Sequence, residues 1–155
     1  MKNIKYLIMD VDGTLTDGKI YMSGEGELCK AFNVKDGSGI CDMAIPIGII
    51  PIIITGRKSN IVLKRCTELG ITHIYQGVTD KIRVLKSVVN DVSAAAYIGD
   101  DINDLGCMEY VKAAGGIVGC PCDAAKNVIR IADYVAEHKG GDGAVRDFIE
   151  WLVER

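Results

Sequence analysis

The sequence predicts an α/β protein with an open parallel sheet and helices on both of its faces. Three observations indicate this class. Apolar residues make up 48% of the chain and charged residues 25%, as in an ordinary globular domain. Short runs of continuously apolar residues recur, which is typical of strands buried on both faces of a parallel sheet. A segment with helical spacing follows most of these runs, and such alternation joins parallel strands through helices.

The strands are expected where the apolar runs are richest in isoleucine, leucine, valine and tyrosine. The first covers residues 6–9, the second residues 49–54 and the third residues 94–98. Three shorter strands are predicted at residues 72–75, 116–118 and 133–135. A sheet of this kind, with a helix after most strands, is Rossmann-like.

Helices are expected in the segments between the strands. They are predicted at residues 37–47, 59–68, 80–90, 102–111, 123–130 and 143–153. Ser59 and Asp123 stand at the start of two of these segments, where a side-chain oxygen can accept a hydrogen bond from a free backbone N–H. The length of the chain favours a single domain over residues 1–155.

Residues 19–32 interrupt the alternation. They predict a β-hairpin, with strands at 20–22 and 28–32 around a turn at 23–26. No other segment is long enough to form a cap domain. A decorative loop is the alternative interpretation, but long excursions in compact domains are usually functional, and this one follows the first strand directly.

Composition and charge exclude several functions. The net charge of −3 argues against a nucleic-acid-binding protein. No apolar run approaches the ~20 residues of a membrane span, and no signal peptide is recognisable, so a cytoplasmic protein is expected. Cys120 and Cys122 suggest zinc, but their spacing does not match a zinc site and no second pair accompanies them.

Polar residues follow the predicted strands at the points where the strands end. They are Asp10, Asp12, Thr55, Asp100, Asp101 and Asp104. In open α/β sheets, ligands bind at this edge. Each residue alone has a structural explanation, as a turn, a strand end or a helix N-terminus, but their coincidence predicts one site. Converging carboxylates need a cation, and oxygen ligands with solvent access favour Mg²⁺.

The same residues resemble the four motifs of the haloacid dehalogenase superfamily of phosphatases. The motifs are residues 10–14, residues 55–57, Lys81 and residues 99–104. Residues 15–21, 30–37 and 140–146 further resemble the 3-deoxy-D-manno-octulosonate 8-phosphate phosphatases, so that the resemblance covers nearly the whole chain. It implies a hydrolase of lipopolysaccharide biosynthesis that removes phosphate from a small sugar acid.

The resemblance implies a role for each acidic residue. Asp10 is the expected nucleophile, which forms an aspartyl-phosphate, and Asp12 is the expected general acid and base. Mg²⁺ is expected on the carboxylates of Asp10 and Asp100 and on the backbone carbonyl of Asp12. Asp101 and Asp104 are expected to orient water bound to the metal.

The remaining polar residues are expected to bind the substrate. Thr55, Gly56 and Lys81 would hold the phosphoryl oxygens. Arg57 follows them directly and suits the carboxylate of a keto acid, which an arginine can bind through two hydrogen bonds. Further candidates are Arg65 and Arg146, although each alone is more often a charge on a helix surface.

The resemblance also implies a homotetramer, in which hairpins join the subunits and neighbouring subunits close each uncapped site. Two alternatives stay open at this point. The substrate can instead be the 9-phosphate of a nine-carbon, sialic-acid-type keto acid, because Thr14 stands where the octulosonate enzymes often have valine. The pair Asn103-Asp104 also occurs in nine-carbon relatives. The chain can also be a non-catalytic oligomerisation module of a sugar-nucleotide synthetase, although Asp10 and Asp12 are both intact. A phosphomutase would need a cap domain, and a receiver domain lacks the late Gly-Asp-Asp motif.

Overall fold

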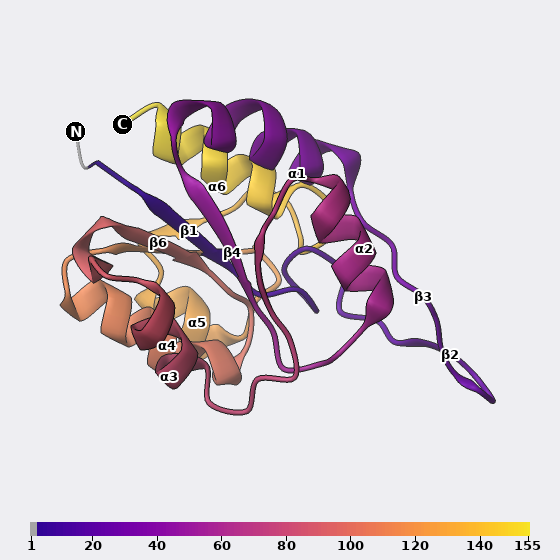
Figure 1. Cartoon of the computed structure of the whole chain (residues 1–155). Helices are drawn as coiled ribbons and strands as arrows, with labels where there is room; N and C mark the ends of the chain where they lie inside the picture. The colour runs from indigo at the N-terminus through magenta and orange to yellow at the C-terminus, as the bar shows by residue number, and fades with distance from the viewer. Residues whose placement is uncertain (1–2) are drawn as a thin grey trace.

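The computed structural model describes residues 3–155, which form a six-stranded parallel sheet with helices on both faces (Figure 1). The strand order is β5-β4-β1-β6-β7-β8, and all neighbouring strands are parallel. The strands are β1 (Tyr6–Met9), β4 (Ile50–Ile54), β5 (His73–Tyr75), β6 (Ala95–Ile98), β7 (Ile117–Cys120) and β8 (Tyr134–Val135). The predicted fold class is confirmed, and within the described residues no cap domain is inserted.

Chain order reverses between β1 and β6, and this reversal determines where the site lies. From β1 the chain proceeds outward to β4 and β5, and it then returns to β6 on the other side of β1. The loops after β1 and β6 therefore leave the sheet toward opposite faces and open a crevice between them. Ligands of open α/β sheets bind in such crevices.

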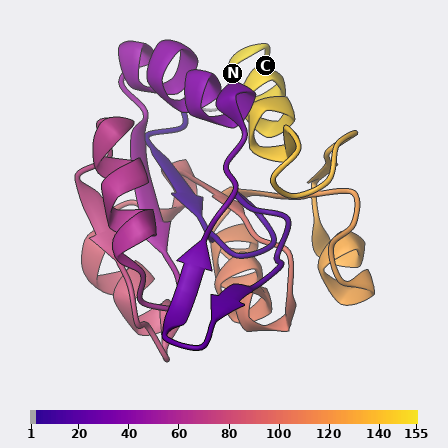
Figure 2. The ribbon, with the colours of Figure 1, turned by 90° about the vertical axis from the view of Figure 1, so that its right-hand side faces the viewer.

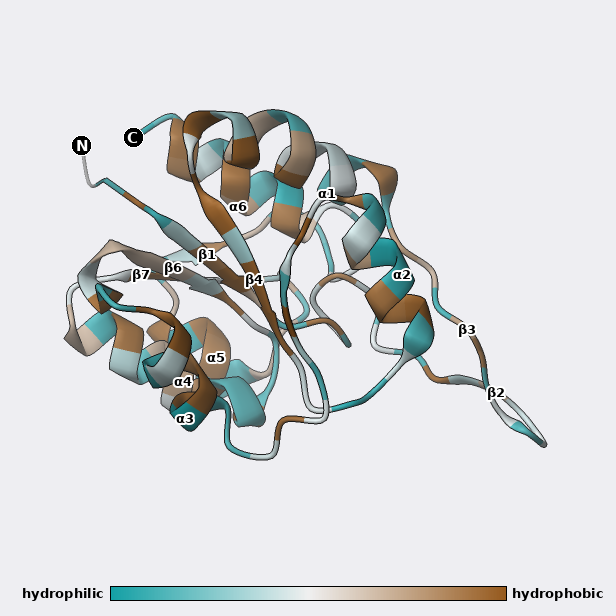
Figure 3. Cartoon of the chain, viewed as in Figure 1, coloured by the Kyte–Doolittle hydropathy of each residue, from teal (hydrophilic) through white to brown (hydrophobic). Residues whose placement is uncertain are grey.

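Two separate sets of helices cover the sheet. Because side chains alternate along a strand, Leu7 and Met9 of β1 join one apolar cluster and Ile8 joins the other. Helices α1, α2 and α6 pack on the first face, and α3, α4 and α5 pack on the second (Figure 1). The helices are α1 (Val34–Ser38), α2 (Asn60–Glu68), α3 (Lys81–Val88), α4 (Ile102–Ala113), α5 (Lys126–Ile131) and α6 (Ala144–Val153). In Figure 3, β4 is hydrophobic along most of its length, as expected of a strand covered on both faces.

The helix predicted at residues 37–47 differs from the observed structure. It begins earlier, at Val34, because Asn33 caps it by accepting a hydrogen bond from the backbone N–H of Lys35. It then changes to a π-helix (Gly39–Ala44) and a 3₁₀ turn (Ile45–Ile47). Gly48 ends the turn with a φ of 89°, a left-handed conformation that glycine adopts without strain.

One of the two predicted helix caps is confirmed and the other is wrong. The Ser59 side chain accepts a hydrogen bond from the backbone N–H of Val62 at the start of α2. Helix α5 begins only at Lys126, and the Asp123 carboxylate instead accepts a hydrogen bond from the backbone N–H of Gly140, 3.0 Å away.

No helix within residues 3–155 is long and apolar enough to cross a membrane.

The predicted hairpin is present, but its second strand is shorter than expected. The antiparallel strands are β2 (Tyr21–Ser23) and β3 (Gly26–Cys29), with a bulge beside Tyr21 (Figure 2). The prediction extended the second strand to Phe32. It ends at Cys29; beyond it, Lys30 pairs with Asp12 and Phe32 packs against the first apolar cluster.

Candidate active site

A cavity of about 450 Å³ opens at the carboxyl ends of β1, β4 and β6. Its lining includes seven of the residues predicted from sequence, which are Asp10, Asp12, Thr55, Gly56, Arg57, Asp100 and Asp101. Segments separated by up to ninety positions thus converge at one place because each follows a parallel strand, and parallel strands end at the same edge of the sheet.

A cluster of carboxylates forms the floor of this cavity. Oxygen atoms of Asp10, Asp100 and Asp104 lie within 4.8 Å of one another. The ammonium of Lys81 lies 3.0 Å from Asp10 Oδ1 and 2.8 Å from Asp104 Oδ1. Both carboxylates and the lysine are almost fully buried. One ammonium therefore faces three acidic groups in a poorly solvated place.

The electrostatics of the cluster suit a divalent cation. Burial and the neighbouring Asp104 raise the pKa of Asp10 to about 6, even though Lys81 opposes the shift. Burial, Asp10 and Asp104 raise the pKa of Asp100 to about 7. Poor solvation and mutual repulsion thus disfavour the charged carboxylates, and a divalent cation bound between them would offset both effects. Closely spaced, hard oxygen donors fit Mg²⁺, so the residues present fit the expected metal.

The raised pKa values predict how stability depends on pH when no metal is present. Asp10 and Asp100 bind protons more tightly in the folded chain than in the unfolded chain, where their pKa is near 3.8. Their stabilising effect is complete below that value and is lost as the pH rises through about 6 and about 7. We expect the free energy of unfolding in EDTA to fall by on the order of 6 kcal/mol between pH 4 and 7.5 through these two groups.

Thermal and urea unfolding at several pH values, with EDTA or with Mg²⁺, measures this dependence. Mg²⁺ should raise the melting temperature more at pH 7.5 than at pH 5, since protons compete with the metal for the same carboxylates. Asp100→Asn is the control, because it removes one of the two titrating groups and should flatten the slope. An equal effect of Mg²⁺ at both pH values, with an unchanged slope in the variant, would contradict the prediction.

Asp104 is held by four protein donors. Lys81 Nζ and the hydroxyl of Tyr97 donate to Oδ1, at 2.8 and 2.7 Å. The backbone N–H groups of Asp100 and Asp101 donate to Oδ2, at 3.0 and 3.3 Å. A carboxylate has about four lone-pair sites, so these donors occupy it fully. Asp104 therefore orients Lys81 and the loop after β6, and its expected role toward metal-bound water stays a prediction.

Tyr97 was missed by the sequence analysis, although a signal was present. It lies in the middle of the buried strand β6, and its side chain is fully buried. A tyrosine in such a place needs a partner for its hydroxyl.

Asp101 lies at the rim of the cavity, where its side chain stays exposed. Its carboxylate caps α4 by accepting a hydrogen bond from the backbone N–H of Ile102, 2.7 Å away.

Asp12 stands apart from the carboxylate cluster and faces two cations. Its Oδ1 accepts a hydrogen bond from Lys30 Nζ, 2.6 Å away, and its Oδ2 lies 4.0 Å from Arg57 Nε. Lys30 also pairs with Glu27 at 3.1 Å, and its side chain is only 3% exposed. Neither Lys30 nor Glu27 was predicted as a site residue, because the direction of a side chain at the base of a hairpin depends on where the strand ends.

Glycines fix the loop that carries Asp10 and Asp12. A Cβ added at Gly13 would lie 1.9 Å from Asp100 Oδ2, and Gly13 has a φ of 91°. A Cβ added at Gly140 would lie 1.9 Å from the carbonyl oxygen of Gly13. Thr14 completes the packing by donating to Asp100 Oδ1 at 3.0 Å. The stretch at 140–143 thus supports the loop after β1 from behind, which explains why it accompanies the site motifs in the sequence.

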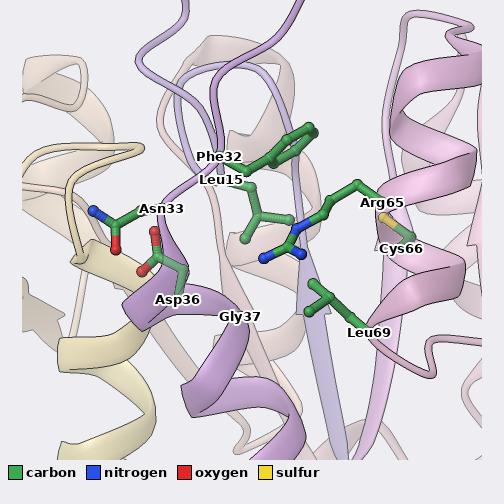
Figure 4. A pocket seen from close by; sticks show the side chains of 8 residues that line it. All are labelled: Leu15, Phe32, Asn33, Asp36, Gly37, Arg65, Cys66 and Leu69. Carbon is green, nitrogen blue, oxygen red and sulfur yellow. The ribbon is translucent and has the colours of Figure 1, made fainter.

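The structure does not bring Arg65 and Arg146 into the cavity. Arg65 lies between α1 and α2, beside Phe32 and Leu69, where it lines a separate cavity of about 10 Å³ (Figure 4). Arg146 pairs with Glu150 on its own helix. Sequence position alone could not show this, because a helical arginine points in a direction that depends on how its helix packs.

Asp36 is a buried residue that the sequence analysis quoted without giving it a role. Its Oδ1 accepts a hydrogen bond from the backbone N–H of Arg146, 2.9 Å away, in the first turn of α6. Helix α6 has no side-chain cap of its own, since its N-cap is Gly143. Asp36 therefore caps this helix from α1, and burial raises its pKa to about 6 despite the donors of α6.

An aspartate pair after the first strand, a threonine after the next, a buried lysine and further aspartates after β6 define the hydrolases of the haloacid dehalogenase superfamily. No family model matches the chain. A curated relative, the 3-deoxy-D-manno-octulosonate 8-phosphate phosphatase of Escherichia coli, is 45% identical over 157 residues, which cover 98% of this chain and 80% of the relative. The chain belongs to the 3-deoxy-D-manno-octulosonate 8-phosphate phosphatase family.

Solved structures agree with this assignment. The enzyme of that name from Moraxella catarrhalis, crystallised with a magnesium ion, a phosphate ion and the 3-deoxy-D-manno-octulosonate (KDO) molecule, is 39% identical with a TM-score of 0.88, and the match covers 99% of this chain and 87% of that one. The cobalt-bound enzyme from Haemophilus influenzae is 35% identical with a TM-score of 0.89, over 99% and 89% of the two chains. The predicted superfamily and family are both confirmed.

Proposed function

We propose that this protein is a Mg²⁺-dependent phosphoric monoester hydrolase that removes phosphate from 3-deoxy-D-manno-octulosonate 8-phosphate. The observation that carries the proposal is the cluster of Asp10, Asp100 and Lys81 at the floor of an open cavity, in a chain whose relatives are named for this reaction. The relative from Moraxella catarrhalis, whose structure contains magnesium, phosphate and the sugar acid, supports both the metal and the substrate class.

Asp10 and Asp12 divide the reaction into two displacements. A carboxylate oxygen of Asp10 attacks phosphorus, the bond from phosphorus to the sugar oxygen breaks, and Asp12 donates a proton to that departing oxygen. Water then attacks the aspartyl-phosphate while Asp12 takes a proton from it, and the bond between phosphorus and Asp10 breaks to release phosphate. The separation of Asp12 from the carboxylate cluster suits a group that must exchange protons with the leaving oxygen.

The remaining residues hold the phosphoryl group and the metal. Thr55, Gly56 and Lys81 are proposed to donate to the phosphoryl oxygens, because two of them line the cavity and the third reaches Asp10 from below. The carboxylates of Asp10 and Asp100 and the backbone carbonyl of Asp12 are proposed to bind Mg²⁺. When bound, the metal offsets the negative charge of the transferring group.

A phosphate-release screen with Mg²⁺ tests the proposal. Its substrates are the 8-phosphate of the eight-carbon keto acid and the 9-phosphate of a nine-carbon keto acid, each with and without EDTA. We expect Mg²⁺-dependent release with a higher kcat/KM for the eight-carbon substrate. A preference for the nine-carbon substrate would move the chain to the other branch. Failure to release phosphate from either would favour a non-catalytic module.

Arg57 is proposed to bind the substrate carboxylate. Its side chain is half exposed and lines the cavity beside Asp12, next to Thr55 and Gly56, which are proposed to bind the phosphate. Arg57→Ala should lower kcat/KM for octulosonate 8-phosphate, mainly through a higher KM. The loss should correspond to roughly 1.5–3 kcal/mol of binding free energy. Hydrolysis of p-nitrophenyl phosphate, which has no carboxylate, should hardly change.

Lys58→Ala is the matched control, because Lys58 is the exposed neighbour of Arg57 and does not line the cavity. Steady-state kinetics on both substrates separates two roles for Arg57. Parallel losses on the two substrates would identify it as a phosphate clamp and exclude the carboxylate role.

The protein is further proposed to be a homotetramer that is joined through its hairpins. Ile20, Met22 and Leu28 are 43%, 63% and 64% exposed, and a two-stranded ribbon cannot shield them alone. Light scattering should give a mass of several chains, and replacing all three residues by serine should give monomers. A monomeric wild-type protein with full activity would contradict the assembly.

The single domain is proposed to act in the cytoplasm. The six cysteines, all within the described part of the chain, are free thiols, and three of them are buried in the apolar clusters. Free thiols at this number fit a reducing compartment.

A further inference from the structure

Lys30 lies at the junction between the hairpin and the active site. It is the first residue after β3, and its ammonium turns back toward the loop that follows β1. It lies 2.6 Å from Asp12 Oδ1 and 3.1 Å from Glu27 Oε1, and its side chain is 3% exposed. An ammonium buried to this degree needs charged partners, and these two carboxylates supply them.

Glu27 in turn contacts the N-terminus of α2. Its second carboxylate oxygen, Oε2, accepts a hydrogen bond from the hydroxyl of Ser59, the N-cap of α2. The backbone N–H of Ser59 in turn donates to Gln76 Oε1 at 2.8 Å. A continuous chain of polar contacts therefore runs from Asp12 through Lys30 and Glu27 to the start of α2. It connects the loop after β1 to the segment after β4.

We propose that Lys30 and Glu27 form a strap between the hairpin and the catalytic loop, and that this strap holds the Asp12 carboxylate where it transfers protons to and from the reacting oxygens. The inference rests on the proposed function, which gives Asp12 its role. Lys30 is a positioning residue, because it does not line the cavity, whereas Asp12 does.

The geometry shows why Asp12 needs such support. Its carboxylate is 20% exposed, and it belongs to no buried cluster that would fix its rotamer. Its other cation, Arg57, is 51% exposed and 4.0 Å away, so this contact is weak and screened by solvent. A displacement of about 1 Å at a catalytic group can cost ~10²-fold in rate. The short, buried contact with Lys30 is therefore the one that fixes Asp12.

The strap also connects catalysis to the hairpin. Glu27 belongs to β3, and the outer residues of the same hairpin, including Met22 and Leu28, are exposed. Contacts that fix the position of the hairpin therefore also fix Glu27 and, through it, the position of Lys30 beside Asp12. The hairpin then takes part in positioning the group that transfers protons.

Kinetics of Lys30→Met on two substrates tests the proposal in the full chain with Mg²⁺. For octulosonate 8-phosphate, whose sugar oxygen must be protonated as it leaves, kcat/KM should fall by ~10-fold or more. For p-nitrophenyl phosphate, whose leaving group needs no proton, kcat/KM should stay within about 2-fold, since this ratio reports only the steps up to its departure. Hydrolysis of the aspartyl-phosphate still needs Asp12 as a base, so the variant should show a burst of nitrophenolate that the wild type lacks.

The burst separates positioning from other roles. A purely structural Lys30 would lower kcat/KM for both substrates alike, and a Lys30 that contacts the sugar would give no burst; either result overturns the proposal. Lys19→Met is the matched control, because Lys19 lies at the base of the same hairpin, is 74% exposed and pairs only with Asp17. An equal loss in this control would also overturn it.

Two further measurements keep the test decisive. Melting temperature and mass in solution show whether Lys30→Met is folded and assembled; if it is not, Glu27→Gln breaks the strap at its other link and should give the same split between substrates, though smaller. Wild-type turnover of octulosonate 8-phosphate tests the proposed function separately. If only that turnover is absent, the proposed substrate fails, while the nitrophenolate burst still tests the strap.

Discussion

Asp10→Asn is expected to abolish phosphate release, with a loss in kcat of about 10⁴-fold or more. An amide is not a nucleophile toward phosphorus, so no aspartyl-phosphate can form. The variant should nevertheless be at least as stable as the wild type in the absence of metal. Asp10 is 4% exposed, and burial first and Asp104 second raise its pKa, so its charge is unfavourable where it lies. Removing that charge relieves the repulsion and leaves Lys81 paired with Asp104, 2.8 Å away.

The two readouts are opposite in sign, which distinguishes a lost nucleophile from a damaged fold. Phosphate release measures the first, and urea unfolding in EDTA measures the second. Asp42→Asn is a matched control: it makes the same chemical change at an exposed carboxylate that accepts a hydrogen bond from Ser38. Wild-type turnover in the Asp10 variant would remove Asp10 from the nucleophile role. A loss of both activity and stability would mean that Asp10 is chiefly structural.

The sequence was sufficient for the sheet and for the floor of the site, for one physical reason. Parallel strands of buried β-branched residues are visible as apolar runs, and their carboxyl ends meet at one edge. Asp10 and Thr55 follow such a run directly and Asp100 follows one residue later, so their convergence depends on no side-chain detail. This is why a cavity between β1, β4 and β6 could be expected before any contact was known.

The sequence did not predict the direction of long side chains that start outside the cavity. Lys30 meets Asp12 only because β3 ends at Cys29, and no periodicity determines that end. Arg65 was expected at the substrate but lies beside Phe32 and Leu69, because the packing of α2 sets its direction.

The helix type of residues 37–47 could not be predicted from the sequence either. Its apolar spacing predicts a helix, but it winds as a π-helix at Gly39–Ala44 and tightens at Ile45–Ile47. Packing overrode local preference here, because Ile40 and Ala44 are fully buried against the first face of the sheet.

Asp12→Asn is expected to lower kcat/KM for octulosonate 8-phosphate by about 10²-fold or more, the usual size of a general acid contribution. Without a proton, the sugar oxygen must leave as an alkoxide. The loss of kcat/KM should be much smaller for p-nitrophenyl phosphate, since nitrophenolate leaves unprotonated. Mg²⁺ affinity should be preserved, because the asparagine keeps the backbone carbonyl that is proposed to bind the metal and the Asp12 carboxylate is not part of the metal cluster.

Stopped-flow kinetics on both substrates checks this expectation. With p-nitrophenyl phosphate, the variant should release nitrophenolate in a burst and then turn over slowly, because the second displacement lacks its base. Asp91→Asn is the control, since Asp91 is exposed, lies outside the cavity and accepts hydrogen bonds from its close neighbour Ser93. Equal losses of kcat/KM on both substrates, without a burst, would show that Asp12 acts by shaping the loop after β1 rather than by moving a proton. In that case Lys30 would hold a structural carboxylate, and the strap would stabilise the loop without taking part in the chemistry.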